Sequence, residues 1–145
     1  MSVVLDSCGW INYFGDGLVA DEYAVYIEAD VGPVVPTIVA FEVHRWALRE
    51  VGKDQANQYA IQLMKGRVVP QTLAISLLAS DLSVKYQLPA CDALIYATAQ
   101  VEGLDLVTSD EHFEHLPGVL YIPYPDKARP KGSTKKGRRA ARRVV

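Results

Sequence analysis

The sequence predicts a three-layer α/β/α sandwich around a central, mostly parallel, five-stranded sheet. Three observations lead to this fold class. Five short runs are apolar and rich in Val, Ile and Leu, stretches with apolar residues at helical spacing separate them, and the runs do not alternate with polar residues. Strands that are apolar on both faces are covered by helices on both sides, since each parallel crossover needs a helix. A chain of 145 residues suffices for one such domain with its own core.

In the N-terminal half, strands are expected at residues 3–5 and 34–36. Ser7, Asp21, Thr37 and Asp54 are expected to cap or open the first four helices, because short polar side chains accept hydrogen bonds from free amides of the first turn. The expected ends of these helices are Phe14, the pair Gly32-Pro33, Gly52 and the region of Gly66.

In the C-terminal half, residues 67–70 form the third expected strand, and a helix over 72–86 follows. Leu88-Pro89 interrupts the helical pattern, so Asp92 is expected at the N-cap of a helix over 93–102 that ends at Gly103. The last two strands are expected at 104–108 and 120–122.

Charge is strongly segregated along the chain. Nine of the 15 Lys and Arg residues lie in 127–145, which leaves six bases against all 17 acids in the rest, a net charge of −11. We therefore expect one domain over residues 1–125 and a basic, disordered C-terminal tail over 126–145. An acidic body attracts divalent cations, whereas a basic tail attracts phosphates without reading sequence.

Several classes of protein are disfavoured. Cys8 and Cys91 match no zinc spacing and are too few for a disulfide framework, so both are expected to be small buried side chains. No secretory leader or membrane-spanning run is present, which favours a cytoplasmic protein without membrane contact. Phosphatases of the haloacid-dehalogenase type need Asp-x-Asp, but Cys8 stands two residues after Asp6. Receiver domains need adjacent acids early in the chain and a lysine after the last strand, a pattern that fits this sequence poorly, and the glycine-rich loops of nucleotide-binding folds do not occur.

Three aspartates are expected to meet at one edge of the sheet. Asp6 follows the first strand, Asp110 follows the fourth, and Asp92 begins the helix that leads into the fourth. Ligands of open parallel sheets bind at the carboxyl ends of the strands, which favours a shared site. Taken singly, each aspartate is better explained as an N-cap or turn residue, so the indication comes from the three together.

Glu42 is the acid that structure alone explains least. It lies midway on the helical row Ile38, Glu42, Trp46, where a carboxylate is costly unless it is paired or bound to a metal. The alternative is that Glu42 reaches solvent or pairs with Arg45 or Arg49.

Each of the four acids lies in a short motif: Val3-Val4-Leu5-Asp6-Ser7, Glu42 within 39–43, Cys91-Asp92-Ala93-Leu94-Ile95-Tyr96-Ala97-Thr98-Ala99, and Leu106-Val107-Thr108-Ser109-Asp110-Glu111-His112-Phe113. With these motifs the chain resembles the PIN-domain nucleases, and specifically the VapC-type toxins of prokaryotic toxin–antitoxin pairs. These motifs occur in the right order and cover residues 1 to about 123.

The resemblance implies an acidic quartet with two polar neighbours: Asp6, Glu42, Asp92 and Asp110, beside Ser7 and Thr108. Asp6 and Asp92 would be the principal ligands of Mg²⁺, or of Mn²⁺ as a substitute, with Asp110 binding directly or through water. Glu42 would either orient the attacking water or complete a second metal site. The implied activity is an endoribonuclease that acts as a toxin, forms a homodimer and binds an antitoxin protein.

Other residues and functions leave alternatives open. Arg45 and Arg49 would contact RNA phosphates or form a solvated helix face, and the His112/His115 pair lacks the third nitrogen or sulfur ligand of a zinc site. The aromatic residues of the first two helices serve either an interaction surface or the core: Tyr13, Phe14, Tyr23 and Tyr26. The competing functions are a PIN nuclease of RNA processing and a PIN-like module that binds RNA or protein without cleavage.

Overall fold

Helices and strands alternate along residues 2–125, the part of the chain that the computed structural model describes. The predicted basic tail, 126–145, lies outside these residues. The strands are β1 Val4–Leu5, β2 Val35–Pro36, β3 Val68–Val69, β4 Leu106–Thr108 and β5 Val119–Tyr121. The helices are α1 Ser7–Gly15, α2 Ala20–Ile27, α3 Thr37–Glu50, α4 Lys53–Met64, α5 Leu73–Tyr86, α6 Ala90–Glu102 and the short 3₁₀ helix η1 Glu111–Phe113.

Every strand pairing in the described chain is parallel. One ladder has the order β1-β4-β5 and the other joins β2 to β3. A bridge between Val4 and Val34, with Val34 N–H donating to the Val3 carbonyl at 2.9 Å, connects the two ladders in the order β3-β2-β1-β4-β5. The predicted five-stranded parallel arrangement is confirmed. The register sets Leu5 opposite Val107, which brings the next residues, Asp6 and Thr108, side by side.

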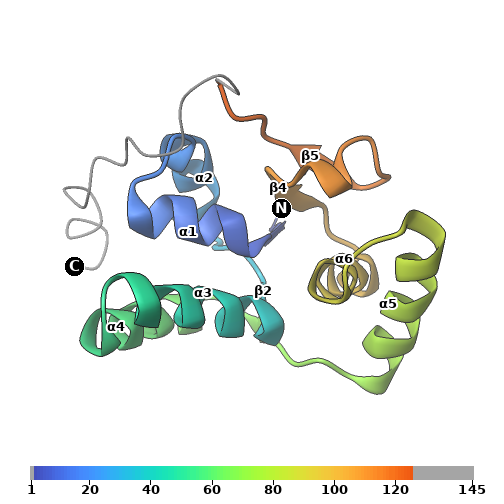
Figure 1. Ribbon diagram of the computed structural model, residues 1–145, viewed down its shortest axis with the longest axis horizontal. Helices are drawn as coiled ribbons and strands as arrows, with labels where there is room; N and C mark the ends of the chain where they lie inside the picture. The colour runs from blue at the N-terminus through green and yellow to red at the C-terminus, as the bar shows by residue number, and fades with distance from the viewer. Residues whose placement is uncertain (1, 126–145) are drawn as a thin grey trace.

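The helices form three pairs around the strands. Figure 1 shows α1 and α2 on one side of the strands and α5 and α6 on the other, with α3 and α4 along the lower edge. Helix α3 contacts both α1 and α6. This central position of α3 matters for the site, because the chain at the starts of α1 and α6 carries two of the predicted acids and α3 itself carries a third.

Aromatic side chains fill much of the core between α1, α3 and α4. The rings of Phe14 and Tyr59 stack with centroids 4.1 Å apart, and Trp46 also stacks on Tyr59. Tyr13, Phe14 and Tyr23 are buried and Tyr26 is half-buried. Core packing, the second of the two interpretations, therefore explains the first three of these residues.

Two helices near the predicted site begin differently from expectation. Asp6, not Ser7, is the N-cap of α1, and its carboxylate accepts the Ser7 N–H at 2.7 Å. Helix α6 begins at Ala90 with Pro89 at the cap position, so Asp92 lies in the first turn and is not the N-cap. Proline without an N–H fits a helix start, where amides have no intrahelical acceptor, and this moves the start three residues earlier.

The starts of α2, α3 and α4 also differ from the sequence prediction. Val19, Pro36 and Gly52 occupy their cap positions, and none provides a side-chain cap. Thr37 is the first residue of α3, where its hydroxyl accepts the Gln71 N–H at 3.3 Å. Two boundaries are confirmed: Thr72 caps α5, and Gly103 ends α6 in the left-handed conformation. No helix within residues 2–125 is long and apolar enough to cross a membrane.

Candidate metal centre

Asp6 lies at the carboxyl end of β1 and is almost fully buried, with 3% of its surface exposed. Its Oδ1 accepts the Ser7 N–H at 2.7 Å, and its Oδ2 accepts the Thr108 hydroxyl at 2.8 Å. Within residues 2–125 no Lys, Arg or His forms an ion pair with this carboxylate. Burial is the main reason that the pKa of Asp6 is raised, while the hydrogen bonds from Thr108 and Ser7 oppose this effect.

Thr108, the last residue of β4, connects Asp6 to Asp110. Its hydroxyl donates to Asp6 and accepts the Asp110 N–H at 3.0 Å, so one side chain sets the spacing of two acids. Beside it, Cys8 Sγ lies 3.7 Å from the Thr108 hydroxyl. Burial raises the pKa of the half-buried Cys8 thiol to about 12, which keeps it protonated and makes it a structural neighbour of the acids.

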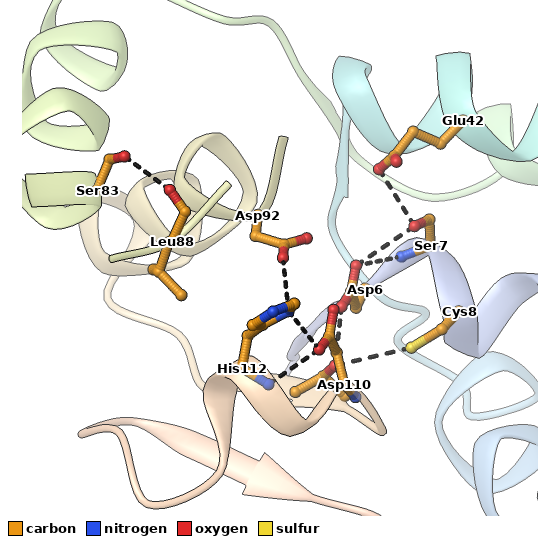
Figure 2. A network of polar contacts seen from close by, with 10 residues as sticks. Asp6, Ser7, Cys8, Glu42, Ser83, Leu88, Asp92, Asp110 and His112 are labelled. Atoms are coloured by element: carbon orange, nitrogen blue, oxygen red, sulfur yellow. Dashed lines mark hydrogen bonds and ion pairs between the residues drawn. The ribbon is translucent and has the colours of Figure 1, made fainter. Parts of the chain in front are cut away.

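Asp92 and Asp110 both approach the ring of His112. Asp110 caps η1 by accepting the His112 N–H at 2.9 Å, which turns the histidine ring back over the two carboxylates. The ring nitrogen Nδ1 lies 2.9 Å from Asp110 Oδ1 and 3.6 Å from Asp92 Oδ2. Figure 2 shows the His112 ring between these carboxylates, with Asp6 beside Asp110.

Glu42 reaches the same site from α3. Ser7 Oγ donates to Glu42 Oε1 at 3.2 Å and lies 3.4 Å from Asp6 Oδ1, so a single hydroxyl lies between the two acids. Arg45 lies close enough to lower the pKa of Glu42, but burial and the charge of Asp6 outweigh it and the pKa is raised. Glu42 is therefore half-buried among acids, and the solvent-facing alternative is wrong.

Burial and repulsion among the carboxylates together set the electrostatics of the site, and burial is the larger of the two causes. The pKa of Asp92 is raised to about 7, first by burial, then by the charges of Asp6 and Asp110, with Glu42 adding to them. His112 opposes this shift. The structure thus brings all four predicted acids together, although a protein gains no stability from clustering like charges. A cation that binds between them would remove this cost.

Within residues 2–125, the remaining candidate residues form no ion pair with the four acids. Arg45 is exposed and stacks over the Phe41 ring with its guanidinium carbon 5.1 Å from the centroid. Arg49 is exposed on the last turn of α3 and forms no ion pair with the four acids in the described chain. His115 lies 3.8 Å from a Glu114 carboxylate oxygen and does not pair with His112.

Sequence reasoning missed His112 as a neighbour of the acids, because the sequence suggested only a zinc pair with His115. The available signal was its position two residues after Asp110. An Asp that caps a helical turn bonds the amide two residues on, which brings that residue's side chain near the carboxylate.

The donor atoms fit a divalent cation. Asp92, Asp110 and His112 each offer an atom within 4.8 Å of the others, and Asp6 adds a buried carboxylate without a cationic partner among residues 2–125. Carboxylate oxygens are the ligands that Mg²⁺ and Mn²⁺ prefer. The residues present therefore suit such an ion.

The protein has an α/β fold with a parallel sheet, and four acids meet near the carboxyl ends of the strands. Proteins of this class are suited to hold a divalent cation next to a phosphate-bearing ligand. The model of the PIN domain family matches residues 3–119. The chain belongs to the PIN domain family, whose members are nucleases.

Solved structures support the same fold. A toxin–antitoxin complex from Klebsiella pneumoniae matches with a TM-score of 0.71 and 26% identity, covering 82% of this chain and 96% of that one. VapBC2 from Rickettsia felis, bound to a promoter DNA fragment, matches with a TM-score of 0.69 and 17% identity over 86% and 99% of the two chains. DNA-bound VapBC from Salmonella typhimurium gives 0.66 and 14% over 86% and 98%. No curated protein matches the chain significantly.

Proposed function

We propose that this protein is a magnesium-dependent endoribonuclease that acts as the toxin of a toxin–antitoxin pair, with Mn²⁺ able to replace Mg²⁺. The observation that carries the proposal is the convergence of Asp6, Glu42, Asp92 and Asp110 in a PIN domain. The 26% identity to a chain of the toxin–antitoxin complex from Klebsiella pneumoniae supports the toxin role.

Asp6, Asp92 and Asp110 would hold the cation. The chemistry that a divalent cation supplies is activation of water and stabilisation of charge on the phosphoryl oxygens during in-line hydrolysis. The water oxygen bonds to phosphorus and the bond from phosphorus to the 3′ oxygen breaks, which yields a 5′-phosphate and a 3′-hydroxyl.

The protein's own residues orient the acids and move the proton. Thr108 donates to Asp6 Oδ2 and fixes that carboxylate in one orientation. Ser7 holds Glu42 Oε1, which leaves Oε2 to accept a proton from the attacking water. The raised pKa of Glu42 makes its carboxylate a better base than an exposed glutamate.

RNA cleavage tests the nuclease part of the proposal. In the presence of Mg²⁺, the wild-type protein is expected to leave 5′-phosphate ends. Asp6→Asn or Asp92→Asn is expected to reduce the cleavage rate by about a thousandfold or more, since each removes a charged ligand of the cation that stabilises the transition state. Asp81→Asn, an exposed aspartate on α5, is the matched control and should cleave normally. Full magnesium-dependent cleavage by both site variants would refute the proposal.

Expression with and without the neighbouring gene tests the toxin part. Growth arrest that the neighbour relieves identifies a toxin and its antitoxin partner. Cleavage without growth arrest points instead to a PIN nuclease of RNA processing. If Mg²⁺ or Mn²⁺ does not raise the melting temperature and no RNA is cut, the protein is a binding module. Size-exclusion chromatography with light scattering tests the expected homodimer.

A further inference from the structure

We propose that His112 is a nitrogen ligand of the divalent cation held by Asp92 and Asp110, and that this ligand makes the site prefer manganese to magnesium. The inference rests on the proposed metal-dependent function and specifies which ion the site selects. It assigns a role to a residue outside the acidic quartet.

His112 Nδ1 lies close to a carboxylate oxygen of each proposed ligand, Asp110 and Asp92. Neighbouring ligands of an octahedral ion with bonds of about 2.1 Å lie roughly 3 Å apart. His112 Nδ1 lies 2.9 Å from Asp110 Oδ1, which matches this spacing, and 3.6 Å from Asp92 Oδ2, which exceeds it by about 0.6 Å. All three donor atoms fall within 4.8 Å of one another.

The backbone next to the His112 ring is held in place by a hydrogen bond and by a buried neighbour. Asp110 accepts the backbone N–H of His112 at 2.9 Å, and the next residue, Phe113, is fully buried against the Tyr96 ring. The backbone of His112 is therefore anchored to α6, the helix that also carries Asp92. The His112 side chain is 58% exposed, so Nε2 can carry the ring hydrogen toward solvent while the Nδ1 lone pair faces the acids.

The choice of metal follows from ligand chemistry. Mg²⁺ binds oxygen almost exclusively, whereas Mn²⁺ accepts imidazole nitrogen beside carboxylates and has a higher affinity than Mg²⁺ for such mixed sets. Replacing His112 should therefore reduce Mn²⁺ affinity much more than Mg²⁺ affinity. The difference between the two reductions is the informative quantity, because a general change in charge or folding affects both ions alike.

The test is calorimetric titration of metal-free, full-length protein with MnCl₂ and with MgCl₂. We expect His112→Asn to weaken Mn²⁺ binding about tenfold or more and Mg²⁺ binding less than about twofold. His115→Asn is the matched control, since that ring is 90% exposed and its ion pair within residues 2–125 is with Glu114, outside the acid cluster. Pulsed EPR of the Mn²⁺-loaded protein adds a direct readout: imidazole nitrogen modulation is expected in wild type and His115→Asn and absent from His112→Asn.

Each outcome has a distinct meaning. Equal weakening of both ions, absence of nitrogen modulation in the wild type, or tighter Mn²⁺ binding by His112→Asn would overturn the inference; the last result would mean that His112 substitutes for the cation. In all three cases the wild type still binds metal, and the proposed nuclease function stands. If the wild type binds neither ion, the proposed function itself fails.

Discussion

At the scale of one residue, the raised pKa of Asp92 shows that the acid cluster lowers the stability of the folded protein when it is ionised. Its pKa of about 7, against an ordinary value of 3.8, means that the folded protein binds a proton that the unfolded chain releases across this interval. Stability therefore falls as pH rises, because the folded state binds more protons than the unfolded state in this range. The raised pKa values of Asp6 and Glu42 act in the same direction.

This sign leads to a prediction for the metal-free protein. With chelator present, the melting temperature is expected to fall from pH 5.5 to pH 8, and saturating Mg²⁺ to remove most of the fall because it neutralises the cluster. Asp92→Asn should be more stable than wild type at pH 8 by roughly 1 to 3 kcal/mol, since a neutral amide removes the repulsion. Urea unfolding across the pH range measures both effects. A wild-type stability that rises toward pH 8 in chelator would contradict the assignment, and Asp81→Asn should follow the wild type.

Single residues also show what the sequence could and could not predict. The position of Asp6 and Asp110 after strands predicted their convergence, because the carboxyl ends of parallel strands share one edge. The place of Glu42 on an apolar row predicted that it faces inward. The hydroxyl contact of Thr108 with Asp6 and the position of His112 depend on strand register and on a turn, and neither leaves a periodic pattern in the sequence.

At the scale of elements, the close approach of α1 and α2 depends on Gly9. A Cβ atom at this position would lie 2.5 Å from Cε1 of the buried Tyr23 ring, far inside contact distance. The Tyr23 hydroxyl lies 2.7 Å from the Oγ of Ser109, the residue directly before Asp110. The fit between two helices is thus connected to the backbone that carries one of the acids.

Gly9→Ala is therefore expected to destabilise the protein by about 1 to 3 kcal/mol, the usual cost of overpacking a core. Gly32→Ala is the matched control: within residues 2–125, no heavy atom outside its two chain neighbours lies within 4 Å of the added Cβ, so its stability should stay within about 0.5 kcal/mol of wild type. Chemical denaturation midpoints compare the two variants. Similar midpoints for both would show that Tyr23 moves aside without cost.

Element types were predictable, whereas most helix starts were not; α5, which Thr72 caps, is an exception. The spacing of apolar residues located the strands and helices, because residues that face the core recur with the period of a helix or run continuously in a buried strand. The start of α6 at Ala90 was missed because Asp92 looked like a capping residue, whereas Pro89 begins the helix and leaves the Asp92 carboxylate available to the site. A polar side chain that serves a site resembles a cap in sequence, and only tertiary contacts separate the two.

At the scale of the whole molecule, acidic and basic residues lie in different parts of the chain, and these parts attract ligands of opposite charge. Residues 1–126 carry six bases and 17 acids, and residues 127–145 carry nine bases and no acid. Without a cation, the acidic body repels the phosphates that the proposed reaction requires. The fold class and the order of the acids were predictable from the sequence, whereas the segregated charge predicts only that the tail attracts phosphates, without saying which.

Removal of residues 127–145 lowers the net charge from −2 to −11. In the Asp92→Asn background, in which cleavage is expected to be too slow to interfere, we expect this truncation to weaken binding of single-stranded RNA and to flatten its salt dependence. The slope of log K against log salt should change by about 0.7 for each RNA phosphate that the tail neutralises in the full chain. Fluorescence anisotropy between low and high KCl measures the slope.

A full-length variant with the nine bases changed to Gln separates the effect of charge from that of chain length, and its RNA binding should match that of the truncated protein. If both variants keep the slope of the full-length Asp92→Asn protein, the tail does not touch RNA, and phosphate binding comes from the metal centre and the bases of the folded domain alone.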